Sequence, residues 1–426
     1  MAFQPPSLVA IIGGGLSGLC LALALKRSNI PCEIYEKRSS SHKQGAAIIL
    51  SPNALRILDS LGVYKEIQKH GYNFKALTYK NEAGETTDAY YFGHAQLYGY
   101  DGLRIDRHIV IGKLLKALLE YGIGVNHEKK FSHIVSETTD SVIFAFEDGS
   151  EASAPLLIGA DGVHSAVRKQ IFPFAEATYS GLMAMIGRIE TAKIRFPVEN
   201  YDLPVHIVAR PGAFLIVPED YNGSRTMAAM QKRFPGRDQD GWRELRADGD
   251  EVLRIYRGEL SEWPSIAQSA IEAVTAENLS IWPFYLVPKL GKWMSDTGSI
   301  VLIGDAAHAI APSAGQGVNQ AVEDSYMLAL VLSKTSLQIS ISKALGFWQT
   351  FRKERVEKVI ELTAQVNARR LPLAEQAKIP PGAIWKDDSS VSGEGGQLRW
   401  LYEPDLDQVV ASWAEEKAKL RIRGFV

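Results

Sequence analysis

Short apolar runs that alternate with helical periodicity open the chain. Residues 8–12 ("LVAII") are all apolar, as expected of a buried parallel strand, and residues 16–26 then carry apolar side chains at helical spacing. A second strand pattern, "PCEIYEK", follows directly. These three segments predict a βαβ unit at the N-terminus.

Two further strand patterns end in an acidic residue beside glycine. The run "PLLIGADGVHSAVRKQIF" predicts a strand that ends at Asp161-Gly162 and a helix that starts near Ser165. The run "GSIVLIGDAAHAIAPSAGQGVNQAVEDSYMLALVL" predicts a strand ending at Gly304-Asp305, a proline-bearing loop and a glycine-rich entry into a helix. Because both strand ends present an acid beside glycine, we expect one extended cofactor that is contacted at several places.

The middle and the end of the chain carry different patterns. Between residues 179 and 234, "YSGLMAMIGRIE", "LPVHIVAR", "AFLIVPE" and "RTMAAMQKR" alternate with period two, which predicts an antiparallel sheet. "FWQTFRKERVEKVIELT" predicts a long helix on which Arg352 and Arg355 have a structural role. Past residue 370, turn formers predict a surface loop before a terminal helix.

Composition narrows the class of protein. The chain has 426 residues, 46% of them hydrophobic, and its net charge of -2 argues against a general nucleic-acid binder or a polybasic membrane anchor. Cys20 and Cys32 both fall in the first βαβ pattern, so we expect core packing in a reducing compartment rather than a disulfide. No signal peptide or apolar stretch of membrane-spanning length is evident, which predicts a cytoplasmic protein without a membrane span. No cluster has metal-ligand spacing, so no metal is predicted.

The first helix entry fits a dinucleotide-binding pattern. Gly13, Gly15 and Gly18 match G-x-G-x-x-G, and Glu36 follows at the end of the next strand. The glycines allow a tight turn, close approach of a pyrophosphate and close helix packing, with the phosphates at the helix N-terminus. A carboxylate at Glu36 can accept both ribose hydroxyls and would repel a 2′-phosphate, which disfavours NADP at this site. NAD and FAD both remain possible from this motif alone.

The glycine-rich entry after Asp305 suggests a redox-active ring. Asp305 can accept hydrogen bonds from a polyol chain such as ribityl. The N–H groups of Gly317, Val318 and Asn319 open a helix, and its N-terminus would face a group that becomes negative, as a flavin edge does on reduction. The alternative is that Asp305 is a helix N-cap and the glycines form an ordinary turn.

Three motifs together resemble a known family. "GGGLSG" with Glu36, "GADGVHSAVR" and "GDAAHAIAPSAGQG" resemble the fingerprints of the class A flavin monooxygenases of the para-hydroxybenzoate hydroxylase fold group. That group includes salicylate hydroxylases, zeaxanthin-type epoxidases and tetracycline-inactivating monooxygenases. The likeness extends from about Val9 to Arg355 and implies FAD rather than NAD as the bound cofactor. Because no second G-x-G-x-x-G occurs, the resemblance implies that NADPH or NADH visits only transiently.

The resemblance also implies which residues contact the cofactor. Ala47, in "GAAIILSPNALRILDSLG", stands where the family usually has glycine, and Arg107 matches a cofactor-contacting arginine, although Arg104 lies close by. Together with the glycine motif, the expected FAD-binding residues are Gly13, Gly15, Leu16, Ser17, Gly18, Glu36, Lys37, Ala47, Arg107, Asp161, Asp305, Gly317, Val318 and Asn319.

Candidates for the substrate pocket come from the sheet and from the third motif. Relatives that hydroxylate phenols carry an aromatic-arginine-glycine triplet on the first strand of the sheet, whereas this chain has Met185-Ile186-Gly187, followed by Arg188 on the same face. That departure argues against a phenolate clamp on this strand. The pocket candidates are Ile186, Arg188, His206, Tyr285 and Pro312. The competing interpretations are an ion pair for Arg188 and core packing for His206 and Tyr285.

The expected fold is α/β, with a Rossmann-like FAD-binding domain, an inserted antiparallel β-sheet substrate layer and a long C-terminal helix. The expected boundaries are residues 1–177 and 281–370 for the FAD-binding domain, 178–280 for the substrate layer, and 371–426 for a C-terminal loop and terminal helix. We expect a monomer or a homodimer.

The resemblance implies an FAD-dependent monooxygenase that uses NAD(P)H and O2. Such an enzyme hydroxylates or epoxidises a cyclic, aromatic or polycyclic small molecule through a flavin C4a-hydroperoxide, and a Baeyer-Villiger outcome stays open. The missing strand arginine and the long final helix favour the epoxidase or tetracycline-inactivating type. The alternatives are a flavin-dependent reductase of the geranylgeranyl-reductase type, which saturates a double bond, and a non-enzymatic FAD-bearing scaffold resembling a Rab-escort protein.

Overall fold

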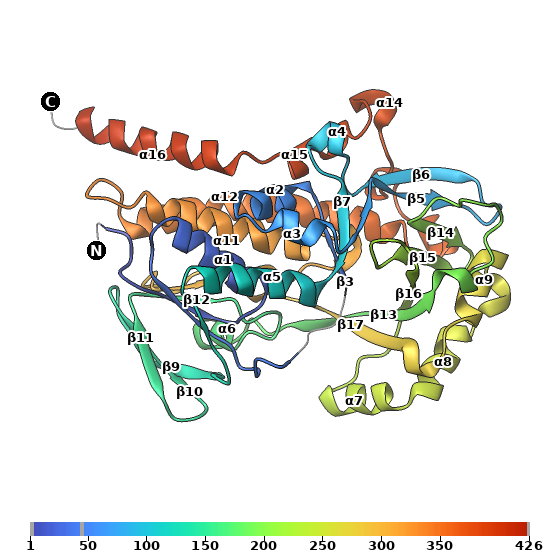
Figure 1. The fold of residues 1–426 in the computed structure, drawn as a ribbon, viewed down its shortest axis with the longest axis horizontal. Helices are drawn as coiled ribbons and strands as arrows, with labels where there is room; N and C mark the ends of the chain where they lie inside the picture. Colours follow the sequence, from blue (N-terminus) through green and yellow to red (C-terminus); the bar gives the residue numbers. More distant parts are fainter. Residues whose placement is uncertain (1–3, 43–46, 424–426) are drawn as a thin grey trace.

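A five-stranded parallel sheet forms the centre of the larger lobe (Figure 1). The computed structural model describes residues 4–42 and 47–423, with side chains described up to residue 419. The strand order in this sheet is β18-β12-β1-β2-β8, and every neighbouring pair is parallel. The strands are β1 (Val9–Ile12), β2 (Cys32–Tyr35), β8 (Val125–Asn126), β12 (Leu156–Gly159) and β18 (Ile300–Leu302).

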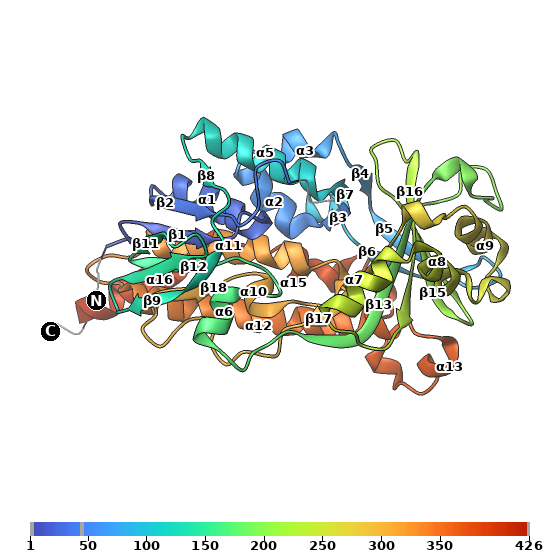
Figure 2. The ribbon, with the colours of Figure 1, turned by 90° about the horizontal axis from the view of Figure 1, so that it is seen from below.

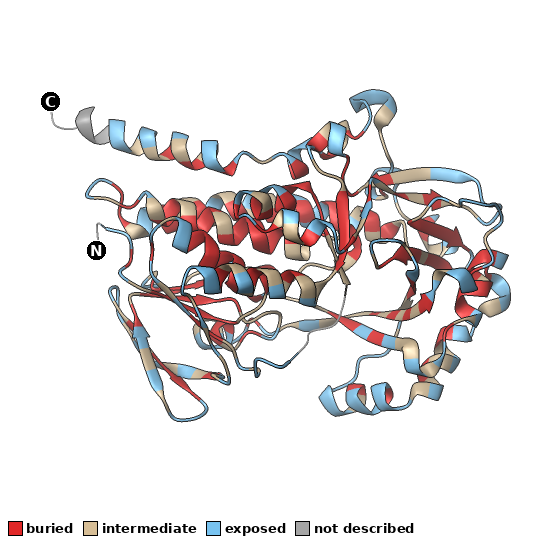
Figure 3. Ribbon diagram, viewed as in Figure 1, coloured by how far each residue is buried: buried red, intermediate tan, exposed pale blue. Residues whose placement is uncertain are grey.

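Helices pack on this sheet, and its strands β1 and β12 are apolar throughout. Helix α1 (Leu16–Arg27) connects β1 to β2 and contacts α11 (Gly317–Ser333) and α5 (Arg107–Glu120) (Figure 2). All residues of β1 and β12 are buried, as expected of parallel strands covered on both faces. Burial is concentrated in this sheet and in α11 (Figure 3). The predicted N-terminal βαβ unit is confirmed.

A seven-stranded sheet forms the second lobe, in the order β17-β13-β16-β15-β14-β5-β6. All pairs are antiparallel except β14 with β5, which is parallel. The four strands expected between residues 179 and 234 are present, but the sheet is larger than residues 178–280, because it recruits a hairpin from residues 76–91 and its edge strand runs to residue 286. The strands are β5 (Ala76–Lys80), β6 (Thr86–Tyr91), β13 (Thr178–Glu190), β14 (Val205–Ala209), β15 (Gly212–Pro218), β16 (Arg225–Arg233) and β17 (Leu279–Leu286).

The long strand β13 separates a core face from a cavity face. Met183 and Met185 are fully buried in a cluster with side chains of the helices that cover the outer face. The alternating residues Ala184, Ile186 and Arg188 line a cavity on the opposite face. The covering helices are α7 (Gln239–Ala247), α8 (Gly249–Arg257) and α9 (Ser265–Glu272).

Two small sheets and the C-terminal helices complete the structure. The small sheets contain β3 (Ala47–Leu50), β7 (Gly102–Asp106) and β4 (Tyr72–Phe74), and β11 (Glu151–Ala154), β10 (Val142–Phe146) and β9 (Phe131–Glu137). The other helices are α2 (Pro52–Ser60), α3 (Tyr64–Gln68), α4 (Ala95–Tyr98), α6 (Ala166–Ile171), α10 (Asp305–His308), α12 (Ile341–Ala368), α13 (Leu373–Gln376), α14 (Ser389–Ser392), α15 (Arg399–Tyr402) and α16 (Leu406–Arg423). Trp413 of α16 stacks on Phe347 of α12, with ring centroids 4.5 Å apart. Within the described parts of the chain, no helix is long and apolar enough to cross a membrane.

Candidate active site

Two cavities approach each other between the lobes. The first, of about 390 Å³, lies at the carboxyl ends of β1, β2 and β12; we call it the glycine-turn cavity, and its lining includes Gly13, Glu36, Arg107, Asp161 and Asp305. The second, of about 150 Å³, lies between the seven-stranded sheet and residues 312–315; we call it the sheet cavity. Arg104 lines the sheet cavity and Arg107 the other, so only three positions of one segment separate the two linings. The two cavities are therefore close neighbours.

The glycine turn is shaped by close packing and leaves room for a ligand. A Cβ atom on Gly13, whose φ is +115°, would lie 2.4 Å from the carbonyl oxygen of Ala160, and one on Gly18 would lie 2.0 Å from that of Gly13. On Gly15 the nearest atom would be an Arg107 nitrogen at 3.5 Å. Gly15 is the N-cap of α1 and no side chain caps the helix. The first N–H groups of α1 therefore remain available, which suits a phosphate.

Glu36 is fixed at the end of β2 before any ligand binds. Its carboxylate accepts hydrogen bonds from the backbone N–H of Gly14 at 2.8 Å and of Arg38 at 3.0 Å. Glu36 and the adjacent Lys37 line the glycine-turn cavity. A carboxylate held in this way can accept hydrogen bonds from ribose hydroxyls without further reorganisation. Leu16, Ser17 and Gly18 belong to α1 and are not part of the cavity lining.

Arg107 presents an unmatched cation to the glycine-turn cavity. Its Nε is buried and has no hydrogen-bond partner among the described residues. Burial lowers the pKa of the guanidinium, while the nearby Asp305 raises it. A phosphate would supply the missing hydrogen-bond acceptor. Arg104 belongs to the other cavity, so the structure separates two arginines that the sequence leaves close together.

The second motif is organised around Asp161 at the end of β12. The Asp161 carboxylate accepts a hydrogen bond from the Ser165 hydroxyl at 2.5 Å and from the N–H groups of Ala166 and Val167 at 2.7 and 3.2 Å. These contacts cap the start of α6, and burial raises the pKa of the Asp161 carboxyl. Asp161 also lines the glycine-turn cavity, so it orders the helix entry and faces the ligand space.

Arg168 joins the second motif to the third. This fully buried side chain donates to the carbonyl oxygens of Val163, Ala175 and Ala306, at 2.6 to 2.9 Å. Because Ala306 follows Asp305 directly, Arg168 holds the two acid-bearing strand ends side by side. No local pattern in the sequence predicts a role for Arg168, because its neighbours Lys169 and Gln170 are also polar.

Asp305 faces the glycine-turn cavity with a free carboxylate. It is exposed, lines the cavity, and has no hydrogen-bond partner among the described side chains and backbone groups. The preceding Gly304 has φ +58° and its N–H donates to Asp324 Oδ2 at 2.9 Å. Asp305 makes no capping hydrogen bond, so the geometry gives no support to the N-cap interpretation.

The N-terminus of α11 carries Gly317, Val318 and Asn319, which are not part of either cavity lining, although a Cβ atom on Gly317 would lie 4.0 Å from Asp305 Oδ1. No side chain caps this helix. The Asn319 side chain accepts from the Ser51 N–H at 2.9 Å and donates to the Ile49 carbonyl at 3.1 Å, which holds β3 against the helix. Only the backbone of Asn319 therefore remains available to a cofactor. Ala47 of β3 lines the sheet cavity, whereas residues 45 and 46 of the same predicted cofactor segment lie outside the described residues.

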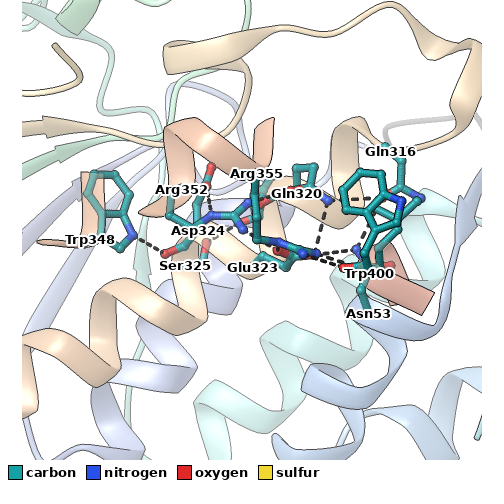
Figure 4. Close-up of polar contacts among 12 residues, drawn as sticks. Asn53, Gln316, Gln320, Glu323, Asp324, Ser325, Trp348, Arg352, Arg355 and Trp400 are labelled. Atoms are coloured by element: carbon teal, nitrogen blue, oxygen red, sulfur yellow. Dashed lines mark hydrogen bonds and ion pairs between the residues drawn. The ribbon is translucent and has the colours of Figure 1, made fainter. Parts of the chain in front are cut away.

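A buried ion network fixes α11 and the third motif (Figure 4). Arg352 of α12 donates to Asp324 at 2.8 Å and also pairs with Glu323. Arg355 donates twice to Glu323, at 2.7 and 2.8 Å. The pKa of Asp324 is lowered to about 2 and that of Glu323 is also lowered; burial raises both, but the adjacent positive groups outweigh it.

This network reaches the cofactor-facing loop from behind. Asp324 Oδ2 accepts from Gly304 and lies 2.6 Å from His308 Nε2. Arg355 also donates to the carbonyl oxygens of Trp400 and Leu401, which ties the C-terminal segment to the same cluster. These contacts support a structural role for both arginines.

The sheet cavity is mostly apolar. Ile186, Arg188 and Pro312, three of the predicted pocket residues, line it. Sequence reasoning missed most of the remaining lining, which comes from several elements: Ile49, Phe74, Leu77, Phe92, Leu215, Val217, Met227, Met230, Gln231, Trp282, Phe284, Ser313 and Arg370. An apolar ring with few polar groups fits such a lining.

His206 and Tyr285 do not line the sheet cavity. His206 is fully buried on β14 and packs against Tyr79, with ring centroids 4.8 Å apart. The ring of Tyr285 packs against that of His164, with ring centroids 5.1 Å apart. Trp282 and Phe284 of the same strand line the cavity instead. The position of His206 agrees with its core-packing interpretation, whereas Tyr285 is only half-buried and lies outside both the cavity lining and the hydrophobic core clusters of the described residues.

Glu219 forms ion pairs with two of the arginines that line the sheet cavity. Its buried carboxylate lies 3.1 Å from Arg104 Nη2 and 3.2 Å from Arg188 Nε. The ion-pair interpretation of Arg188 is therefore realised, although the residue also lines the cavity. In the described part of the chain, no group of three or more His, Cys, Asp or Glu side chains could hold a metal ion.

The glycine-turn cavity and the adjoining loop fit FAD. The uncapped start of α1 and the unpaired Arg107 suit a pyrophosphate, and Glu36 suits a ribose. The free Asp305 carboxylate suits a ribityl chain, and the uncapped start of α11 suits a ring that gains negative charge. The cofactor ring would then lie where the two cavities approach each other.

Comparisons with known proteins agree with this fit. Residues 7–363 match the family model described as an FAD binding domain. The chain is 27% identical to a salicylate hydroxylase of Pseudomonas putida, over 99% of this chain and 96% of the relative. It is also 27% identical to an FAD-dependent urate hydroxylase of Klebsiella pneumoniae, over 82% of this chain and 87% of the relative.

Solved structures show the same fold. FqzB matches with a TM-score of 0.78 at 22% identity, over 99% of this chain and 96% of that one. Klebsiella pneumoniae HpxO, crystallised with FAD and uric acid, matches with a TM-score of 0.70 at 23% identity, over 96% of both chains. The curated relatives named above are hydroxylases, so they favour hydroxylation and give no support to the reductase or scaffold alternatives. The chain belongs to the FAD-binding-domain family and is an FAD-dependent monooxygenase.

Proposed function

We propose that this protein hydroxylates a small aromatic ring compound held in the sheet cavity, with O2 and NADPH or NADH as co-substrates. The observation that carries this proposal is the approach of an apolar cavity to the FAD-fitting cavity at Arg104/Arg107 and at Asp305/Pro312. A cavity of about 150 Å³ is of the size that accommodates benzene, which favours one or two fused rings over a larger polycycle.

With FAD bound, the nicotinamide would supply two electrons, and O2 would supply the oxygen atom inserted into the ring, its second atom leaving as water. The chain positions the reactants for this chemistry. The start of α1 and Arg107 would hold the pyrophosphate, Glu36 would hold the ribose, and Asp305 would hold the ribityl chain. The N–H groups of Gly317 and Val318 would stabilise negative charge on the ring.

The sheet cavity excludes water from the reacting atoms. Ile186 and Met227 form part of its sheet wall, and Phe74 and Phe92 form part of the wall towards the larger lobe. Pro312 fixes the backbone of the loop opposite the sheet. A mostly apolar pocket suits an oxygen-transfer reaction because shielding from water limits loss of the activated oxygen as hydrogen peroxide.

The proposal is tested with the purified FAD-loaded protein. We expect a flavin absorption spectrum, and we expect one- and two-ring aromatic compounds to accelerate NADPH- or NADH-driven loss of the oxidised flavin band. Oxygen-dependent formation of a hydroxylated product supports the proposal. Product formation without O2 would instead support a reductase, and a flavin that no nicotinamide reduces would refute both.

A further inference from the structure

The sheet cavity contains one arginine without a negative partner. Arg104 and Arg188 share Glu219, which is only 5% exposed. Arg370 also lines the cavity, but no carboxylate among the described residues lies within ion-pair distance of it. A cation in an apolar cavity is costly unless an acceptor neutralises it.

Most of the hydrogen-bonding capacity of Arg370 is unused. Its Nη2 donates to the carbonyl oxygen of Ser313 at 2.8 Å, and its Nε is buried without a partner. A guanidinium carries five N–H donors in a planar fork that matches an oxyanion. Burial lowers the pKa of Arg370, which is the expected sign for a cation that lacks a counter-charge.

The polar groups behind Arg370 cannot supply that charge. Tyr79, Tyr90 and His206 are fully buried, and their hydroxyls and ring nitrogens have no hydrogen-bond partner among the described residues. Burial raises the pKa of Tyr79 to about 12 and raises that of Tyr90 as well, and it lowers the pKa of His206. All three are therefore neutral near pH 7. The adjacent Arg369 is different, because it lies 3.7 Å from the Asp88 carboxylate.

The backbone around Arg370 is held in place. Arg370 follows α12, and its N–H donates to the carbonyl oxygen of Asn367 at 2.9 Å. The Gln376 side chain donates to the carbonyl oxygens of Arg369 and Leu371, at 3.2 and 2.7 Å, on either side of it. Its contact with Ser313 places it beside the loop at Pro312. The guanidinium is therefore pre-positioned at the cavity.

We propose that Arg370 is a specificity-determining residue that binds an acidic oxygen of the substrate, a carboxylate or a ring oxyanion. This rests on the proposed function, since it assumes that the sheet cavity holds the substrate ring. Ile186 occupies the strand position where phenol-hydroxylating relatives carry arginine, and Arg370 supplies a positive charge from the segment after α12 instead. Arg104 and Arg188 keep their pairing with Glu219.

The test compares benzoate with benzamide, which have nearly the same shape but differ in charge. Affinities are measured from the change in the flavin spectrum of the FAD-loaded enzyme, without turnover. We expect benzoate to bind at least about tenfold more tightly than benzamide. Arg370→Gln abolishes this preference, and Arg370→Lys retains part of it because the charge remains. Arg369→Gln, the matched control, keeps the wild-type preference.

Three results would overturn the role of Arg370. They are a wild-type enzyme that binds benzoate no more tightly than benzamide, a wild-type enzyme that binds neither probe, and an Arg370→Gln variant that keeps the preference. The comparison of benzoate with benzamide in the wild-type enzyme remains a valid test even if Arg370→Gln fails to fold. Failure of the proposed function gives a different result from failure of the Arg370 role. If only the proposed function fails, the enzyme still prefers benzoate to benzamide but oxygenates no ring compound.

Discussion

Replacing Arg352 with methionine tests whether the buried ion network holds the site together. Arg352, Glu323 and Asp324 have no exposed side-chain surface. The substitution removes the bonds of Arg352 to both carboxylates and to Gln320. Arg355 and His308 remain as partners, but each carboxylate loses one of its charged contacts.

The expected loss of stability follows from leaving buried charge uncompensated. Breaking a buried ion pair by removing one partner costs about 3–5 kcal/mol. With an unfolding entropy of about 2.1 cal/mol/K per residue, a chain of 426 residues would lose about 3–6 °C in Tm. Chemical denaturation of wild-type and Arg352→Met holoenzymes measures the difference directly. Arg254→Met, which removes an exposed pair with Glu251, is the control and should leave the denaturation midpoint essentially unchanged.

Lowering the pH should reduce the difference in the free energy of unfolding between the wild type and Arg352→Met. The folded-state pKa values of Asp324 and Glu323 are depressed, so their contribution to stability is present above the unfolded values near 4 and is lost as pH falls through the folded values, which for Asp324 is about 2. Without Arg352 the pKa values of the two carboxylates are depressed less, so the variant loses less free energy of unfolding when the pH falls. A cost below about 1 kcal/mol at pH 7, or a difference that does not narrow below pH 4, would refute this account.

Three further substitutions test the cofactor cavity. Asp305→Ala should lower FAD retention, and full flavin occupancy in that variant would contradict the role of its free carboxylate. Arg107→Met should weaken FAD binding by about tenfold or more, measured by flavin titration, because the phosphate loses a charged donor. Gly18→Ala should prevent normal folding or FAD uptake, since its Cβ would lie 2.0 Å from a carbonyl oxygen, whereas Gly112→Ala, with open space around it, should be tolerated.

Local patterns in the sequence predicted the strands and motifs of the FAD-binding lobe. The apolar run at β1, the glycines of its turn and the helix after them are near neighbours in the chain, so their geometry depends on short-range rules. The same holds for the four strands between residues 178 and 233. These elements were predictable because each carries its own periodicity.

The sheet cavity was less predictable because distant segments build it. Tyr285 and Phe284 are adjacent, and only the register of β17 decides which of them faces the cavity. The hairpin at residues 76–91 joins the sheet through β14, which no local pattern shows. Arg370 follows a helix in a segment without periodicity, so its place at the cavity depends on long-range packing.

Mass spectrometry of the product formed under isotopically heavy O2 tests the central claim most directly. FAD-loaded protein, NADPH or NADH and an aromatic ring compound that accelerates flavin reduction are combined, and the product is analysed. The account predicts a ring product that carries one heavy oxygen atom. A product without heavy oxygen, or nicotinamide oxidation that yields only hydrogen peroxide with every ring compound tested, would contradict it.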